Sequence, residues 1–136
     1  MRKRTRAREL ALQMLYQVDA RGPESIEDLD SFLLREEPED AEVREFARAL
    51  VVGTIEVMPS LDEILGAAAE NWQIRRMATV DRNILRMAVF EMLHRPDIPA
   101  KVSINEAIDM GKRFSTQQSG SFINGILDRV RRDRNL

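Results

Sequence analysis

The sequence predicts an all-α protein. Apolar residues recur three and four positions apart along most of the chain, and no segment alternates apolar and polar residues over the length of a strand. Proline and glycine divide the chain into short blocks. The 136 residues, 43 % of them hydrophobic, suffice for one domain spanning residues 1–136 with a substantial core. We expect about seven helices in a bundle, divided near Pro59 into two sub-bundles that the first helix ties together.

The first half of the chain predicts four helices. The first covers residues 9–18 and ends at the Gly22-Pro23 pair, and a short second one starts near Ser25. A third helix follows Asp40. Pro59 interrupts it, and Ser60 with Glu63 three residues later has the pattern of a capping box that opens the fourth. Trp72, the only tryptophan, lies just beyond and is interpreted as a packing anchor.

The second half predicts three more helices. Residues 79–95 are the most apolar and are expected to form the buried central helix. Ser103 with Glu106 has the pattern of a second capping box at the start of a sixth helix. The last helix is expected after the polar stretch at residues 115–121 and carries several arginines near its end.

Charge is distributed unevenly along the chain. The formal net charge is −2, yet the first eight residues hold five cations and no acid. The cations of this basic N-terminal arm, residues 1–8, are Arg2, Lys3, Arg4, Arg6 and Arg8. Such a cluster favours contact with a phosphate backbone, although a solubilising tail has the same pattern. Residues 24–45 hold ten acids and should face away from a nucleic acid.

The predicted first helix also groups residue types that suit nucleic acids. Arg6, Gln13 and Tyr16 fall on its far side from the apolar stripe, at helical spacing. Aromatic rings stack on bases and amides bind base edges. Packing of Tyr16 under a neighbouring helix is the alternative.

The sequence contains few groups for covalent chemistry. It has no cysteine, and His94 is the only histidine, so a zinc site or a histidine relay lacks ligands. The stretch 120–125 lacks the Gly-Lys-Ser/Thr end of a phosphate loop. We therefore expect no enzyme, no cofactor and no metal. No segment approaches the length of a membrane span, and a cytoplasmic location is expected.

Several separated motifs resemble the NusB family of bacterial transcription antitermination proteins. They are the start at residues 4–16, the segment Val-Asp-Arg-Asn-Ile-Leu-Arg-Met-Ala at 80–88, Asp-Ile-Pro at 97–99, Lys-Val-Ser-Ile-Asn-Glu-Ala-Ile at 101–108, and Ser-Gly-Ser-Phe-Ile-Asn-Gly-Ile-Leu-Asp at 119–128. The resemblance covers essentially the whole chain. It implies two packed three-helix sub-bundles and a non-enzymatic factor. Such a factor binds boxA single-stranded RNA of nascent ribosomal-RNA transcripts together with ribosomal protein NusE, within the antitermination complex on RNA polymerase.

The resemblance also implies site residues. For RNA these are Arg4, Arg6, Arg8, Gln13, Tyr16, Arg86, Gln118 and Phe122. For NusE they are Arg76 and Asp81, whereas Arg75 stands where some relatives carry an acid. Core packing is the alternative role for Phe122.

Three other functions remain open at this point. The same fold is found as an RNA-binding domain in some ribosomal-RNA cytosine methyltransferases, but this chain is too short to add a cofactor-binding domain. A helical adaptor that binds only protein is a second alternative. A DNA-binding helix-turn-helix is the third, without a clear recognition helix to support it. Both a monomer and a homodimer fit the resemblance.

Overall fold

The computed structural model describes residues 2–70 and 72–136, and all regular structure in that part is helical. Seven α-helices and two short 3-10 segments follow in the order α1 (Lys3–Arg21), η1 (Pro23–Asp28), α2 (Leu29–Glu36), α3 (Ala41–Glu56), α4 (Met58–Ala68), η2 (Ile74–Arg76), α5 (Thr79–His94), α6 (Ala100–Phe114) and α7 (Gln117–Asp133). The predicted all-α class is confirmed. None of the described helices has the length and hydropathy that a membrane span requires.

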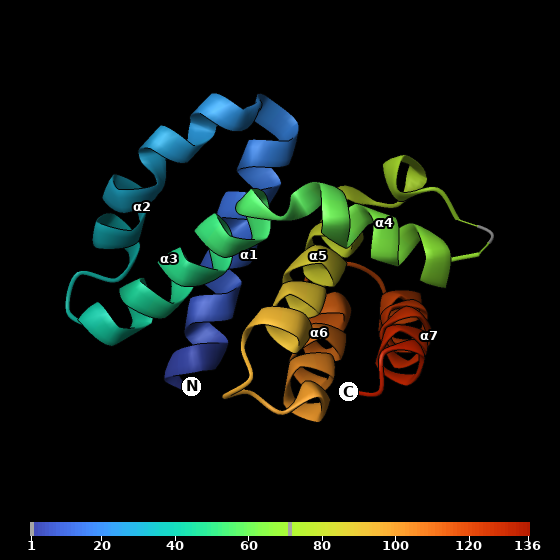
Figure 1. Cartoon of the computed structure of the whole chain (residues 1–136). Coiled ribbons are helices and arrows are strands. Elements are labelled where there is room, and N and C mark those ends of the chain that lie inside the picture. The colour runs from blue at the N-terminus through green and yellow to red at the C-terminus, as the bar shows by residue number, and fades with distance from the viewer. Residues whose placement is uncertain (1, 71) are drawn as a thin grey trace.

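The helices form two groups around α5 (Figure 1). One group contains α1, α2 and α3, and the other contains α5, α6 and α7, with α4 packed against α5 and α7. The long α1 contacts both α3 and α5, so it ties the two groups together as the sequence predicts. The buried apolar side chains of both groups belong to one hydrophobic cluster.

The N-terminal basic segment is part of a helix. The helix α1 begins at Lys3, six residues earlier than the apolar pattern predicts, so the predicted arm is the first turns of α1. Tertiary contacts explain the difference, because the Thr5 hydroxyl donates to Glu106 of α6 at 2.6 Å and Arg8 is buried between α5 and α6. Such contacts lie outside the reach of a local pattern.

The two predicted capping boxes are wrong. Helix α4 already begins at Met58 and has no side-chain cap, so Ser60 lies within its first turns. Helix α6 begins at Ala100, and the Ser103 hydroxyl donates to Glu91 of α5 at 2.9 Å instead of capping a backbone. Both serines thus lie inside helices that begin earlier than the sequence predicted.

Two other side chains do cap helices. Asp40 accepts from the backbone N–H groups of Glu42 and Val43, at 3.1 and 3.3 Å, and starts α3 as predicted. Thr116 and Ser119 form a reciprocal capping box that starts α7 within the stretch predicted to be a polar connection. This cap places the N-terminal turns of α7 beside α5, where the hydroxyl of Ser119 reaches Asp81.

Helix α5 is the buried centre of the fold, as predicted. It contacts α1, α3, α4, α6 and α7, and eleven of its sixteen residues are buried. Four of the buried residues are polar or charged: Asp81, Asn83, Arg86 and Glu91. Buried charge requires partners, and these partners fix the position of α1.

Candidate nucleic-acid interface

The first turn of α1 carries exposed cations that pair with acids of the same chain. Lys3 Nζ lies 3.3 Å from Glu42 Oε2 and 3.4 Å from Asp40 Oδ2, and Arg4 Nη2 lies 3.5 Å from Asp97 Oδ2. Exposed ion pairs contribute little to stability. An incoming phosphate can therefore replace these acids at low cost.

Arg6 stands at the edge of this cation cluster. Its guanidinium lies 3.3 Å from Glu37 and 3.7 Å from Glu9, and its side chain is about one-third exposed. Arg4 and Arg6 thus remain accessible to a phosphate. The acids around them imply that phosphate binding includes an exchange of partners.

Arg8, by contrast, points into the protein. Its Nε and Nη2 donate to both carboxylate oxygens of Glu91 at 2.8 and 2.7 Å, and Nη1 donates to Glu106 at 3.2 Å. Burial alone would lower the pKa of Arg8, but the hydrogen bond to Glu91 and the attraction of both carboxylates raise it overall. With 2 % of its surface exposed, Arg8 cannot contact phosphate in this structure. Its predicted role is therefore corrected to a structural one.

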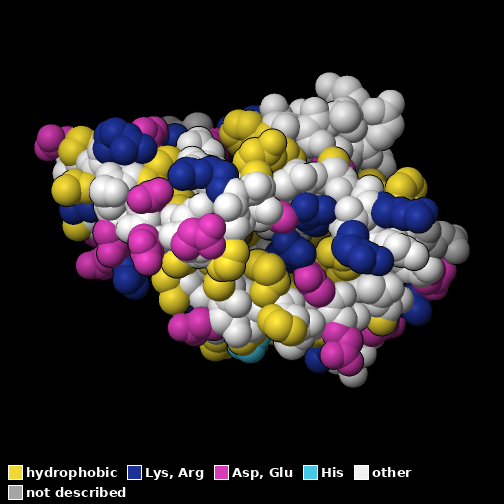
Figure 2. Space-filling model, turned by 90° about the horizontal axis from the view of Figure 1, so that it is seen from above, with side chains coloured by type: hydrophobic (Ala, Val, Ile, Leu, Met, Phe, Trp, Pro, Cys, Tyr) yellow, Lys and Arg dark blue, Asp and Glu magenta, His cyan; other side chains and the backbone are white. Residues whose placement is uncertain are grey.

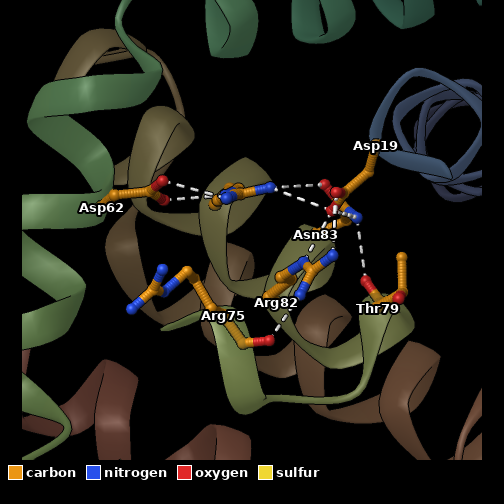
Figure 3. A network of polar contacts seen from close by, with 7 residues as sticks. Asp19, Asp62, Arg75, Thr79, Arg82 and Asn83 are labelled. Carbon is orange, nitrogen blue, oxygen red and sulfur yellow. Dashed lines mark hydrogen bonds and ion pairs between the residues drawn. The ribbon is translucent and has the colours of Figure 1, made fainter. Parts of the chain in front are cut away.

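Arg86 is held in the same way, by carboxylates of Asp62 and Asp19, which Figure 3 shows on either side of α5. Its Nε and Nη2 donate to Asp62 of α4 at 2.7 and 2.9 Å, and Nη1 donates to Asp19 of α1 at 3.1 Å. Arg82 completes the network with two hydrogen bonds to Asp19, at 2.7 and 2.8 Å, and these bonds are the main cause of a lowered pKa at Asp19. Arg86 thus joins α1, α4 and α5 rather than projecting toward RNA, and its predicted role is corrected as well.

Gln13 and Tyr16 line a shallow groove, which we call the tyrosine groove. It has a volume of about 380 Å³. Its lining is Glu9, Leu12, Gln13, Tyr16, Gln17, Val80 and Phe114. Tyr16 is 44 % exposed and does not pack under a neighbouring helix. Its ring is therefore accessible from solvent, so its RNA-binding role stays a prediction.

A second concavity gathers four of the predicted site residues. This tryptophan hollow measures about 230 Å³. It is lined by Trp72, Arg76, Met77, Ala78, Asp81, Thr116, Gln118, Ser119 and Phe122. Gln118 and Phe122 were predicted for RNA, and Arg76 and Asp81 for NusE. The structure places both sets around one hollow.

The groove and the hollow are neighbours on the surface. Val80 lines the groove, and the next residue, Asp81, lines the hollow. Phe114 lines the groove, and Thr116, two residues later, lines the hollow. A third concavity of about 660 Å³ lies between α1 and α6 and is lined in part by Arg2, Lys112 and Arg113. This third concavity is of mixed charge, because Glu106 and Asp109 also line it.

The sequence did not lead us to assign three residues of this surface to the site, namely Lys112, Arg113 and Phe114. Lys112 and Arg113 are exposed at the end of α6, and the Arg113 guanidinium lies 4.8 Å above the ring of Phe114. Arg113 also pairs with Glu9. Two adjacent cations directly before an aromatic residue were a usable signal, but residues 112–114 lie between the motifs at 101–108 and 119–128 on which the family resemblance rests.

The acid-rich segment at residues 24–45 forms η1, α2 and the start of α3. Acidic side chains gather over the part of the surface where α2 and α3 lie, at the left in Figure 2. Basic side chains are more frequent toward the right of that face. The segment predicted to face away from a nucleic acid instead contacts the cations of α1, because Asp40 and Glu42 pair with Lys3 and Glu37 pairs with Arg6.

Comparison with known proteins identifies the family. The family model of NusB matches residues 5–132. The transcription antitermination protein NusB of Anaeromyxobacter dehalogenans (strain 2CP-1) is 50 % identical over 129 residues, covering 94 % of this chain and 89 % of that protein. A solved structure of T. maritima NusB matches with a TM-score of 0.83 and 38 % identity over 96 % of this chain and 91 % of that one.

A crystal structure of antitermination factors NusB and NusE in complex with dsRNA also matches. Its TM-score is 0.88, with 26 % identity over 98 % of each chain. The fold, the order of the motifs and the extent of these matches agree, and the chain belongs to the NusB family.

Proposed function

We propose that this protein is a transcription antitermination factor that binds boxA single-stranded RNA of nascent ribosomal-RNA transcripts together with ribosomal protein NusE. In this role it helps to assemble the antitermination complex on RNA polymerase, in the cytoplasm and without catalysing a reaction. The observation that carries the proposal is the pair of adjoining concavities whose exposed or half-exposed rings include Tyr16 and Phe122.

These concavities suit single-stranded RNA because its bases can leave a stack and lie on protein rings. Gln13 and Gln118 stand beside the rings and provide amides for base edges. Arg4 and Arg6 provide accessible cations for phosphates, and Arg2, Lys112 and Arg113 extend this set along α6. Arg8 and Arg86 support the surface from inside through their ion pairs.

NusE is proposed to raise the affinity for RNA by adding a second RNA-contacting surface. One small set of cations and rings gives modest affinity that salt reduces strongly. A bound second protein raises the effective concentration of the RNA at both surfaces. Arg76, which is exposed, is the proposed NusE contact, whereas Asp81 is 9 % exposed and offers little area to a protein partner.

A filter-binding titration tests this cooperation. Retention of boxA RNA is measured against increasing concentrations of the protein, with and without NusE. The proposal expects the midpoint to move to lower protein concentration when NusE is present. An unchanged midpoint would remove NusE from the mechanism.

A helical adaptor that binds only protein is the second candidate. Exposed ion pairs such as that of Lys3 with Glu42 fit this function, because each partner can form a new ion pair with a charged residue of another protein. Competition separates the two functions. Unlabelled competitor RNA is added to the protein with labelled boxA RNA bound. From an adaptor, unrelated RNA and boxA RNA would displace the labelled RNA equally well, whereas from a boxA-binding factor boxA RNA would displace it at lower concentration.

A further inference from the structure

We infer that Trp72 and Phe122 form a corner that binds one unpaired RNA base, with the Asp81 carboxylate as acceptor for the amino group of that base. The inference rests on the proposed RNA-binding function and makes it more specific. It assigns Trp72, which the sequence suggested to be a packing anchor, to ligand binding.

The exposure of Trp72 contradicts the packing role. More than half of its surface, 54 %, is exposed, although a tryptophan at a helix end normally packs against the core. The ring of Phe122 is its only aromatic neighbour among the described residues, with centroids 5.5 Å apart and planes inclined by 77°. Such an arrangement leaves ring surface uncovered on the Trp72 side.

The angle between the rings defines what fits there. Two rings near a right angle form a corner, in which a flat ring can stack on one and turn its edge to the face of the other. The hollow of about 230 Å³ is smaller than the roughly 300–1,000 Å³ of sites for drug-sized molecules. A single planar base is the matching ligand.

The floor of the hollow provides a hydrogen-bond acceptor. Asp81 lines it and is nine-tenths buried; its Oδ2 accepts from the Ser119 hydroxyl at 3.2 Å, while Oδ1 has no hydrogen-bond partner among the described residues. A buried acceptor without a partner is costly, so a donor on the ligand is favoured there. Aspartate accepts from the exocyclic amino groups of bases, which uracil lacks. Adenine, cytosine and guanine carry such an amino group, whereas uracil has only its ring N3–H to donate.

The surroundings favour RNA over a hydrophobic protein segment. Arg76 and Gln118 border the hollow, and the adjoining tyrosine groove presents a second accessible ring. A chain of bases and phosphates can follow this succession of rings and cations. A buried carboxylate, in contrast, is unfavourable beneath an apolar side chain of a protein partner.

The first arm of the test uses the fact that Trp72 is the only tryptophan. Its emission is recorded while boxA RNA is added without NusE, and anisotropy of labelled RNA is measured in the same solutions. The inference expects quenching that follows the same binding curve as the anisotropy. Binding without any change in Trp72 emission would overturn the inference and leave the proposed function intact.

The second arm compares variants. Trp72→Ala is expected to weaken boxA binding on the order of tenfold, because one stacked base is lost, whereas Trp72→Phe should retain most of the affinity. Leu34→Ala is the control, since Leu34 is equally exposed, at 57 %, but lies on α2 away from the hollow. Equal affinities of Trp72→Ala and the unchanged protein would overturn the inference.

The third arm locates the base. Abasic sites are placed one at a time along the boxA RNA. One position should cost the unchanged protein at least as much affinity as Trp72→Ala does, and it should cost the Trp72→Ala variant clearly less than it costs the unchanged protein. At that position, an analogue without the amino group should bind several-fold more weakly, and Asp81→Ala, which removes the acceptor, should abolish this preference. Additive losses at every position would contradict the inference.

The outcomes also separate this inference from the proposed function. Failure of boxA RNA to bind in the presence of NusE would remove the proposed function itself. A response of Trp72 emission to NusE alone, with none to RNA, would assign the hollow to the protein partner and overturn only the inference.

Discussion

Arg8 of α1 and Glu91 of α5 form a two-point ion pair, with Nη2 2.7 Å from Oε1 and Nε 2.8 Å from Oε2. Ser103 donates to the same carboxylate at 2.9 Å, and Thr5 donates to the neighbouring Glu106 at 2.6 Å. The network fixes the N-terminal turns of α1 against α5 and α6. It therefore determines the position of the exposed cations in the first turns of α1.

The first prediction concerns the stability that this pair provides. Arg8→Ala leaves Glu91 buried without its cation and should lower the free energy of unfolding by about 3–5 kcal/mol. Urea denaturation followed by circular dichroism measures the loss. Arg4→Ala is the matched control and should have a much smaller effect, because the Arg4 side chain is half exposed. A stable Arg8→Ala variant with weakened RNA binding would restore the phosphate role to Arg8.

The second prediction separates accessible from buried arginines through salt. Each phosphate contact on single-stranded RNA contributes about 0.7 to the slope of log affinity against log salt. Arg6→Ala should reduce the magnitude of this slope by about that amount if one phosphate contact is lost. Arg86→Lys should leave the slope unchanged, because Arg86 is occupied by Asp62 and Asp19. Equal changes in both variants would argue against this division.

The third prediction concerns the ring of Tyr16. Tyr16→Ala should weaken binding of boxA RNA by about 1–3 kcal/mol, the contribution of one stacked base. Tyr16→Phe retains the ring and should bind nearly as well as the unchanged protein. Isothermal titration with boxA RNA measures both. If Tyr16→Phe were as weak as Tyr16→Ala, the hydroxyl rather than stacking would be responsible.

The fourth prediction concerns pH and Asp19. Hydrogen bonds from Arg82 are the main cause of its lowered pKa, and Asn83 and the charge of Arg86 add to the effect. The folded pKa thus lies below the unfolded value of about 3.9. The stabilising contribution is present above about pH 3.9 and disappears as the pH falls through the folded pKa.

Thermal unfolding between neutral pH and about pH 3 tests this expectation. Asp19→Asn should be less stable than the unchanged protein at neutral pH, and the difference should shrink as the solution becomes acidic. Glu24→Gln is a control, because Glu24 is exposed and has no ion pair among the described residues. A constant difference across this range would show that the charge of Asp19 contributes nothing.

The fifth prediction compares two helical glycines. A Cβ at Gly53 of α3 would clash with the ring of Phe90, so Gly53→Ala should cost about 1–3 kcal/mol of stability through overpacking. A Cβ at Gly66 of α4 meets nothing within 4 Å, so Gly66→Ala should stabilise by about 0.5–1 kcal/mol. Melting temperatures of the two variants should move in opposite directions. A shift in the same direction would contradict the packing around Phe90.

Local sequence patterns predicted the helices well but their starts poorly. The apolar stripes identified α1 and the central α5, and Asp40 marked the start of α3. Ser103 matched a capping pattern, yet its hydroxyl binds Glu91, twelve residues away. A capping pattern records only neighbours in the chain, so it cannot reveal a side chain that has a tertiary partner.

The same limit applies to the predicted site. Tyr16 lies on the exposed side of α1 as its spacing indicated, because helical periodicity determines the exposed face. Arg8 and Arg86 were predicted on the surface, but their acids Glu91 and Asp62 are 83 and 24 residues distant. Charge density along the chain does not tell which cations are neutralised after folding. Exposure of Trp72 likewise follows only from the packing of η2 and α7.

Anisotropy of a labelled boxA RNA and of a scrambled RNA of equal length, near physiological salt and with and without NusE, tests the central claim most directly. The account predicts tighter binding to boxA than to the scrambled RNA, with a preference that increases when NusE is added. Equal binding to both RNAs, unaffected by NusE and decreasing in parallel as salt rises, would contradict it and leave only a nonspecific basic surface.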